Sequence, residues 1–344
     1  MIQKHGGNIY GYGDILDFSS NINPLGPPES VRATYLASAE TMDRYPDSSC
    51  TELRSKLSMH FGLPAENIVC GNGAADLIYR AVHVLRPKSA LLCRPCFGEY
   101  EKALAETDCN ISEYFLRESE GFILGEDFLI TVSKGYDMVI LCSPNNPTGR
   151  LIPPHILETT AEICRYNGTV LICDECFMGF TGLASTHSLT NFMNDNCIVL
   201  DAFTKLYAMA GLRLGYMLCG NTAIAEKITE SGQYWSVSSP AQTAGIAALD
   251  ESDYVERTIE LIRREREFLT NELTALGLKV CPSDADFLLF RSETELYDLM
   301  LTKGILIRRC DSFRGLDSSY YRIAVKNHKD NSRFIDTLRR CLNG

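Results

Sequence analysis

Short apolar runs alternate with amphipathic patterns along the chain from about residue 67 onward. Five runs have the length of a strand, and they read NIVCG (67–71), SALLCRP (89–95), DMVILCSP (137–144), TVLICDE (169–175) and CIVLDAF (197–203). Because these runs are nearly continuous rather than alternating, we expect strands that are buried on both faces. The amphipathic stretches between them predict helices. The pattern therefore predicts an α/β fold in which helices flank a mostly parallel sheet.

The last third of the chain has a different pattern. Residues 254–276 form a long, charged, amphipathic stretch that predicts one helix. The segments DFLLFR, GILIRR and YYRIAVK and a final helical pattern follow it, which indicates a small α+β domain. Near the start, residues 19–30 are rich in Pro and Gly and predict an irregular arm whose side chains reach the functional site. We expect an N-terminal arm (1–35), a large α/β domain (36–245) and a small C-terminal α+β domain (246–344).

Composition and charge narrow the class of protein. The chain has 344 residues, of which 45% are hydrophobic and 22% are charged, as in an ordinary soluble globular protein. A net charge of −11 argues against nucleic acid as a partner, although it leaves room for a local basic pocket. The N-terminal sequence lacks the apolar core of a signal peptide, and no apolar run approaches the roughly 18 residues that span a bilayer. Fourteen cysteines without such a signal indicate a reducing compartment, so we expect a cytoplasmic protein that contacts no membrane.

Two cysteine pairs have the C-x-x-C spacing, Cys93 with Cys96 and Cys173 with Cys176. A zinc site or a redox pair is one interpretation of them. Fourteen cysteines produce such pairs by chance, however, and these two lack the short, repeated spacing of a zinc ribbon. We therefore expect no metal, and the aspartate between the second pair becomes the residue of interest.

Polar residues follow several of the predicted strands, at the sheet edge where α/β proteins bind ligands. Residues 71–76 (GNGAAD) join a strand to a helix, and free N–H groups there predict an anion site, with a plain helix-opening turn as the alternative. Residues 143–149 (SPNNPTG) predict a rigid turn that aims the Asn amides, or a turn without function. Asp174 ends a buried strand and needs a partner there, unless it simply caps a helix.

Lys205 also follows a buried strand, and Arg213 lies eight residues further along. A lysine in a mostly apolar setting has a lowered pKa and can act as an amine nucleophile. The alternative is a lysine whose stem is buried while its amine reaches water.

These segments, in this order, resemble the fold-type I pyridoxal-phosphate (PLP) enzymes of the aminotransferase class I/II group over nearly the whole chain. The combination of NNPTG, then DE, then a lysine with GLRLGY is more specific than any one of these motifs. The resemblance implies a seven-stranded sheet, with Lys205 as the Schiff-base lysine and Asp174 paired with the pyridinium nitrogen. It also implies a homodimer with a shared site. The remaining implied cofactor contacts are Asn146 to the ring hydroxyl oxygen, Phe97 stacked on the ring, Thr204, Arg213 and the Ala74 and Ala75 backbone at the phosphate, and Tyr45 at the phosphate of the neighbouring subunit.

The chemistry of PLP agrees with these residue types. The pyridine ring accepts electrons from Cα best when its nitrogen stays protonated, and a nearby carboxylate such as Asp174 favours that charged form. The planar guanidinium of Arg213 suits a phosphate. Lys205 would hold the aldehyde, be displaced by the substrate amine, and then serve as acid and base at Cα.

Within the group, the two nearest families are the threonine-phosphate decarboxylases and the histidinol-phosphate aminotransferases. Three features are typical of the first: HGGN (5–8), DE-x-F with Phe177, and the tail LIRRCDSFRGLDSSYYRIAVK (306–326). The resemblance then implies decarboxylation of O-phospho-L-threonine to aminopropanol phosphate for the cobalamin side chain, with Arg322 holding the substrate carboxylate. The candidates for its phosphate are His5, Asn23, Arg308 and Arg314.

Two other functions remain open at this point. The first is transamination of histidinol phosphate or of an aromatic amino acid on the same scaffold. The second is a PLP-binding regulator, but such proteins carry an N-terminal DNA-binding domain, and here the catalytic pattern begins almost at Met1 in an acidic chain.

Four residues depart from the pattern of the group. Ala202 stands where a Ser or Thr usually binds the cofactor phosphate, and Gly179 replaces a common Asp. Asp286 occupies the position of a usual Asn. Asp201 is unexpected so near a phosphate unless its side chain points away. These departures bear on the substrate rather than on PLP binding.

Overall fold

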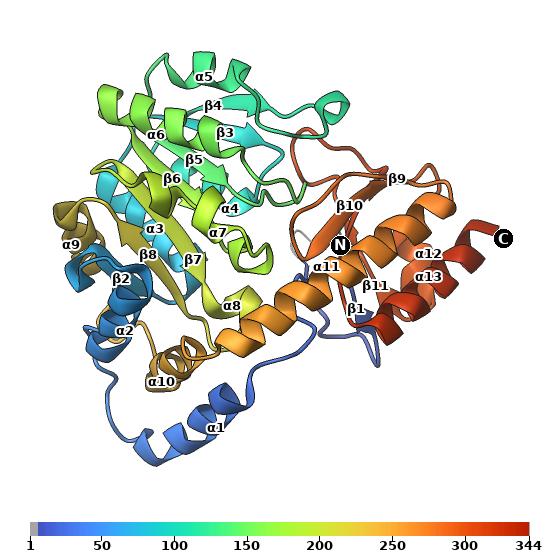
Figure 1. The fold of residues 1–344 in the computed structure, drawn as a ribbon, viewed down its shortest axis with the longest axis horizontal. Helices are drawn as coiled ribbons and strands as arrows, with labels where there is room; N and C mark the ends of the chain where they lie inside the picture. The colour runs from blue at the N-terminus through green and yellow to red at the C-terminus, as the bar shows by residue number, and fades with distance from the viewer. Residues whose placement is uncertain (1–5, 344) are drawn as a thin grey trace.

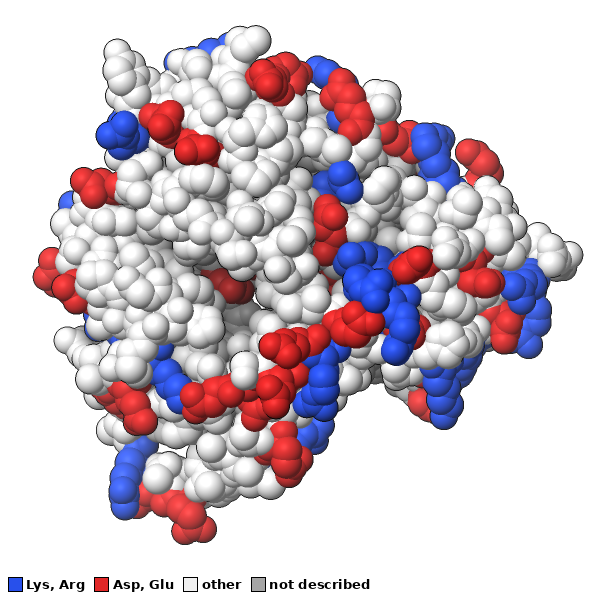
Figure 2. All heavy atoms as spheres, viewed as in Figure 1, with Lys and Arg blue, Asp and Glu red and all other residues white. Residues whose placement is uncertain are grey.

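The computed structural model describes residues 6–343, so the candidate His5 lies outside the described residues. Figure 1 shows a large sheet between layers of helices and a smaller sheet beside it, with the long helix α11 (Ser252–Ala275) running along both. Acidic and basic side chains crowd the exposed side of this helix in Figure 2. Within residues 6–343, no helix combines the length and the apolar character that crossing a membrane requires.

The large sheet has seven strands in the order β2-β8-β7-β6-β5-β3-β4. Only β8 runs antiparallel to its neighbours, so the sheet is mostly parallel, as predicted. The strands are β2 (Ile68–Gly71), β3 (Ser89–Arg94), β4 (Asn110–Phe115), β5 (Met138–Cys142), β6 (Val170–Asp174), β7 (Cys197–Ala202) and β8 (Gly215–Cys219).

Two of these strands were not predicted from the apolar runs. β4 is the edge strand, and none of its residues is fully buried, so its sequence NISEYF carries no continuous apolar run. β8 is fully buried, but its first two residues, Gly215 and Tyr216, belong to the GLRLGY motif. That motif was interpreted as part of the functional site and not as a strand.

Helices cover both faces of this sheet. One face packs on α2, α6 and α10, and the other on α3, α4 and α9. Successive residues of a strand point to opposite faces, so each strand supplies both cores. The helices of this region are α2 (Thr51–Phe61), α3 (Gly73–Leu85), α4 (Gly98–Ala105), α5 (Asp127–Val132), α6 (Pro154–Asn167), α7 (Ala184–His187), α8 (Phe203–Leu206), α9 (Thr222–Glu230) and α10 (Ser239–Ala248).

The smaller region contains a four-stranded antiparallel sheet in the order β12-β13-β10-β9. Its elements are β9 (Lys279–Val280), β10 (Phe287–Arg291), α12 (Tyr297–Thr302), β12 (Arg308–Arg309), β13 (Tyr320–Ala324) and α13 (His328–Asn343). The N-terminal arm ties the two regions together. Its strand β1 (Leu16–Asp17) pairs with β11 (Ile305–Leu306), and its helix α1 (Glu29–Ala37) packs against α10.

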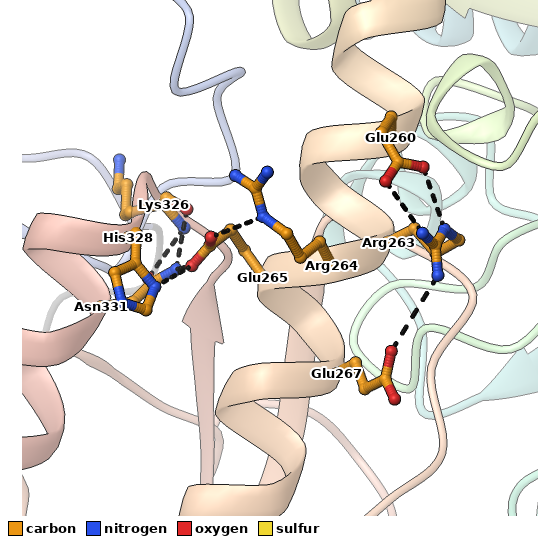
Figure 3. Close-up of polar contacts among 8 residues, drawn as sticks. All are labelled: Glu260, Arg263, Arg264, Glu265, Glu267, Lys326, His328 and Asn331. Atoms are coloured by element: carbon orange, nitrogen blue, oxygen red, sulfur yellow. Dashed lines mark hydrogen bonds and ion pairs between the residues drawn. The ribbon is translucent and has the colours of Figure 1, made fainter.

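A buried carboxylate fixes the last helix on α11. Glu265 is 1% exposed, and its oxygens accept hydrogen bonds from Asn331 Nδ2 at 3.1 Å and Arg264 Nε at 3.2 Å, while His328 Nδ1 lies 3.1 Å away (Figure 3). A buried carboxylate is stable only with such partners. This contact therefore joins α13 to α11, and the two helices pack together against one face of the small sheet.

Candidate active site

A cavity of about 290 Å³ opens at the carboxyl ends of β5, β6 and β7. It brings together ten of the residues that the sequence predicted, namely Ala74, Ala75, Phe97, Asn146, Asp174, Thr204, Lys205, Arg213, Arg308 and Arg322. The arm contributes Gly6, Ser19, Ser20 and Asn21, so its predicted approach to the site is what the structure shows.

Lys205 enters the cavity from α8, the short helix that follows β7. Its amine lies 5.9 Å from the ring centre of Phe177. Burial lowers the pKa of this amine, and the positive charges of Arg322 and Arg213 act in the same direction, while the charge of Asp286 opposes them. A lowered pKa increases the fraction of neutral, nucleophilic amine.

Asp174 ends β6 and is 6% exposed. Its carboxylate accepts hydrogen bonds from Tyr100 Oη at 2.6 Å and from the backbone N–H of Cys176 at 3.1 Å. Burial and the charge of Asp174 raise the pKa of Tyr100 well above its usual value, so the phenol remains a donor. Sequence reasoning missed Tyr100, although it lies three residues after Phe97 and therefore near it on the first turns of α4.

The start of α3 provides an anion-binding end to the cavity. Ala74 and Ala75 lie in its first turn, where backbone N–H groups have no partner within the helix. A Cβ atom on Gly73, which has a φ of +85°, would come within 2.4 Å of the Arg213 guanidinium. Glycine at this position therefore leaves the space that Arg213 needs to lie over the helix start.

Arg322 comes from β13 and is 6% exposed. It donates hydrogen bonds to Asn146 Oδ1 and, at 2.9 Å, to the carbonyl of Ser19, while its Nε atom has no partner. Burial lowers its pKa to about 10, which leaves it charged at neutral pH. In the arm, the buried Oδ1 of Asn21 also has no partner. Unpaired buried polar atoms at a cavity mark places where a ligand completes the hydrogen bonding.

Arg308 is the second arginine that the small sheet sends into the cavity. It is 5% exposed, donates to Ser312 Oγ at 2.6 Å and lies 5.4 Å from the ring centre of Phe313. The two guanidinium groups interact, because the charge of Arg308 contributes to the lowered pKa of Arg322. Two like charges held this close suit a ligand with more than one negative charge.

The structure does not bring two of the predicted substrate residues to the cavity. The amide of Asn23 donates to Leu206 O at 2.7 Å and Thr258 Oγ1 at 2.8 Å, so it fastens the arm to α8 and α11. Arg314 lies on the surface, 57% exposed at its side chain, and pairs with Glu113 at 2.9 Å. In the described chain, both side chains make these contacts outside the lining of the cavity. Tyr45 is also outside this cavity, being 78% exposed and stacked on Trp235.

The two cysteine pairs do not converge. Cys93 and Cys173 pack in the core on the α6 side of the sheet, whereas Cys96 packs in the core on the α3 side and Cys176 lines the cavity. Across residues 6–343, the side chains of His, Cys, Asp and Glu form no group of three or more that is arranged to hold a metal ion. As strand alternation predicts, Cys173 points away from the cavity that Asp174 faces.

Comparison with known proteins agrees with this geometry. The family model described as aminotransferase class I and II matches residues 13–338. The chain belongs to this family. It is 37% identical to threonine-phosphate decarboxylase of Salmonella typhimurium, over 99% of this chain and 97% of that protein. It is 33% identical to histidinol-phosphate aminotransferase 2 of Archaeoglobus fulgidus, over 95% and 93% of the two chains. The crystal structure of histidinol-phosphate aminotransferase from Clostridium acetobutylicum superposes with a TM-score of 0.89 at 31% identity, covering 96% of this chain and 99% of that chain.

Members of the class I and II family use pyridoxal 5′-phosphate, so the protein is a PLP-dependent decarboxylase or aminotransferase. The residues of the cavity fit this cofactor. The start of α3 with Arg213 suits its phosphate, Lys205 suits its aldehyde, and Asp174 suits its pyridinium nitrogen. The unpaired Oδ1 atom of Asn21 and the unpaired Nε atom of Arg322 belong to residues that line the same cavity.

Proposed function

We propose that this enzyme decarboxylates O-phospho-L-threonine and releases aminopropanol phosphate and CO₂, as a step toward the cobalamin side chain. The observation that carries the proposal is the set of three arginines in one cavity, Arg213, Arg308 and Arg322. Arg213 at the start of α3 serves the cofactor phosphate. Arg322 and Arg308 line the same cavity as two further cations, and phosphothreonine has both a carboxylate and a phosphate.

The residues of the cavity divide the work of such a reaction. When bound, PLP supplies a ring that takes up the electron pair released at Cα. Asp174 holds the ring nitrogen in its protonated form, with Tyr100 orienting the carboxylate through its 2.6 Å hydrogen bond. Lys205 delivers or removes a proton at Cα. The buried guanidinium of Arg322 orients the substrate carboxylate.

Placement of the carboxylate decides between decarboxylation and transamination. When PLP is bound, it would take up the electron pair of whichever bond at Cα the substrate anchors present to it. An anchor for the substrate phosphate at Arg308, combined with Arg322, sets the rotation of the substrate about its Cα. One rotation would present the bond to the carboxylate, which would leave as CO₂, and another would present the Cα–H bond instead.

Transamination of histidinol phosphate is the second candidate, and the Archaeoglobus and Clostridium relatives favour it. Histidinol phosphate has a phosphate but no carboxylate. Its single phosphate would have to serve both Arg308 and Arg322, whereas phosphothreonine offers each arginine its own anion. An aromatic amino acid, the other substrate considered for an aminotransferase, has a carboxylate but no phosphate. It would leave the phosphate anchor at Arg308 unused.

We also propose that the active unit is a homodimer. Tyr45 is exposed and stacked on Trp235 at 4.3 Å between ring centres, on a surface outside the cavity of its own chain. A second copy that covers this surface would bury both rings and bring Tyr45 to the partner's cofactor phosphate. Dimers that share sites in this way bury large apolar side chains at their interfaces.

The test is to incubate the purified enzyme with phosphothreonine, phosphoserine and histidinol phosphate in parallel. We expect CO₂ and aminopropanol phosphate from phosphothreonine without an added amino acceptor. Conversion of histidinol phosphate with 2-oxoglutarate, and no CO₂ from phosphothreonine, would replace the proposal with the aminotransferase. Lys205→Ala provides the control, since it should abolish both turnover and the borohydride-reducible attachment of PLP to the protein, read by mass spectrometry.

A further inference from the structure

Asp286 lies in the turn before β10 and is 1% exposed. Both of its carboxylate oxygens are buried, and neither has a hydrogen-bond partner among the described residues. Leaving a buried carboxylate without hydrogen bonds is costly, and native proteins rarely do so outside functional sites. The backbone around Asp286 is well fixed, because its carbonyl accepts the N–H of Val325 at 2.7 Å.

The surroundings of Asp286 are cationic. The charged groups that act on it are Lys205, Arg322 and Lys326, in that order of strength, and none of them forms an ion pair with it in residues 6–343. Burial raises the pKa of Asp286 to about 6, and these three cations oppose the rise. At neutral pH the Asp286 side chain is therefore mostly an anion, and it interacts with the guanidinium of Arg322 and with the amino groups of Lys205 and Lys326.

The residue after Asp286 belongs to a row of two aromatic rings that ends at Lys205. The next residue is Phe287, and its ring centre lies 5.4 Å from the Cζ atom of Arg322. The same ring packs edge-on against Phe177, with 5.0 Å between the two ring centres. Lys205 lies 5.9 Å from the centre of that second ring. The groups that act on Lys205 are Asp286, Arg322, Cys176 and Arg213, and Asp286 is the strongest of them.

We propose that Asp286 is a positioning residue that increases the protonated fraction of Lys205 and thereby biases this enzyme toward decarboxylation rather than transamination. The bias toward decarboxylation rests on the proposed function. The effect of the Asp286 charge on Lys205 does not, because it concerns the protein without substrate. The usual residue at this position in the resembled group is Asn, which has nearly the same shape but no charge.

The bias follows from the proton balance of the two reactions. When CO₂ leaves, the electron pair of the broken C–C bond must receive one proton at Cα. The ammonium of Lys205 supplies that proton and becomes an amine, which takes up a proton from solvent. Transamination begins in the opposite sense, because the amine of Lys205 must first remove the proton from Cα. An anion near Lys205 stabilises the ammonium through a charge interaction that is strong where water is excluded.

The first experiment measures the titration of Lys205 directly. PLP is removed, and the extent of reductive methylation of Lys205 is followed against pH by peptide mass spectrometry in the wild type and in Asp286→Asn. We expect the apparent pKa of Lys205 to fall by about one unit in the variant. The matched control is Asp284→Asn, since Asp284 lies two residues away but pairs with Arg150 at 3.5 Å, and it should leave the titration unchanged. An identical Lys205 titration in wild type and folded Asp286→Asn would overturn the proposal.

The second experiment measures how reactions partition. PLP-loaded wild type and Asp286→Asn are given phosphothreonine, and the pyridoxamine phosphate formed is compared with the CO₂ released. We expect the ratio of pyridoxamine phosphate to CO₂ to rise about tenfold in the variant, which is the factor that a one-unit change in pKa produces. A shifted titration with an unchanged ratio would overturn the bias. Absence of CO₂ from the wild type would overturn the proposed function and the bias together, whereas the titration, which needs no substrate, tests the charge coupling separately.

Discussion

Asp174 and Asp201 end neighbouring strands of the same sheet, but they face different cavities. Asp174 ends β6 opposite Leu200 of β7, and it lines the cavity of about 290 Å³ that holds Lys205. Asp201 is the next residue along β7, so its side chain points to the other face. There it lines a second cavity of about 560 Å³. Figure 2 shows a hollow on this face, between the places where Figure 1 draws α7 and α8.

The two aspartates accept hydrogen bonds from the same kinds of donor. Each accepts one backbone N–H and one tyrosine hydroxyl: Tyr100 donates to Asp174 at 2.6 Å, and Tyr216 donates to Asp201 at 2.9 Å. Burial raises the pKa of Asp201 to about 8, so it is mostly neutral at pH 7. A carboxyl at a strand end is therefore not a functional site by itself. The face to which strand alternation turns the side chain, and the cavity it lines there, decide its role.

The sharpest test of this comparison is to remove each carboxylate in turn. We expect Asp174→Ala to lower kcat/KM by roughly 1,000-fold or more, because the partner of the cofactor nitrogen is lost, whereas Asp201→Ala should stay within about fivefold of the wild type. Activity on phosphothreonine and retention of PLP after desalting provide the measurement. Similar losses in both variants would show that the two faces of the sheet are not functionally distinct.

A smaller effect separates the two tyrosines. Tyr100→Phe removes the hydrogen bond that orients Asp174, and we expect kcat to fall by about tenfold with little change in KM, since one hydrogen bond to a charged group is worth about 1.5–3 kcal/mol at most. Tyr216→Phe removes the equivalent bond to Asp201, and its kcat should stay within about twofold. If Tyr216→Phe were the more damaging change, the second cavity would have to take part in catalysis.

Much of this arrangement was predictable from the sequence, and the reasons are local. A strand buried on both faces has to be apolar throughout, which revealed five strands of the large sheet. The polar residues that end β5 and β6 and follow β7 then mark the site, because parallel strands bring their carboxyl ends to one edge. The small antiparallel sheet was likewise predicted from its short apolar segments.

The features that escaped prediction depend on contacts between distant parts of the chain. β4 lacks a distinct pattern because an edge strand is only half covered. Asn23 and Arg314 have the chemistry of anion-binding residues, but the amide of the first is used up between α8 and α11, and the second pairs with Glu113 on the surface. The direction of Asp201 required the register of β7 against β8, which pairs it with Tyr216. A single sequence contains no direct record of such pairings.

The smallest predicted effect concerns stability rather than turnover. The pKa of Asp201 is about 8 in the folded protein and 3.8 ordinarily, with burial as the main cause, so the folded state keeps a proton that the unfolded chain has lost between these pH values. The stability that protonated Asp201 contributes is complete below about pH 4 and is lost as the pH rises through about 8. Asp201→Asn is uncharged throughout. We therefore expect its Tm, relative to the wild type, to increase by a few degrees between pH 5 and pH 9.

Glu175 borders the same cavity, and its pKa is raised to about 7 by burial. Its charge also raises the pKa of Asp201, so the difference between wild type and Asp201→Asn includes the effect of this change on Glu175. Asp195→Asn is the control, because Asp195 is exposed in the turn before β7 and should leave the pH dependence of Tm unaltered. A pH-independent difference in Tm between Asp201→Asn and the wild type would mean that Asp201 is already ionised in the folded protein. The contrast between the two aspartates would then rest on the direction of their side chains alone.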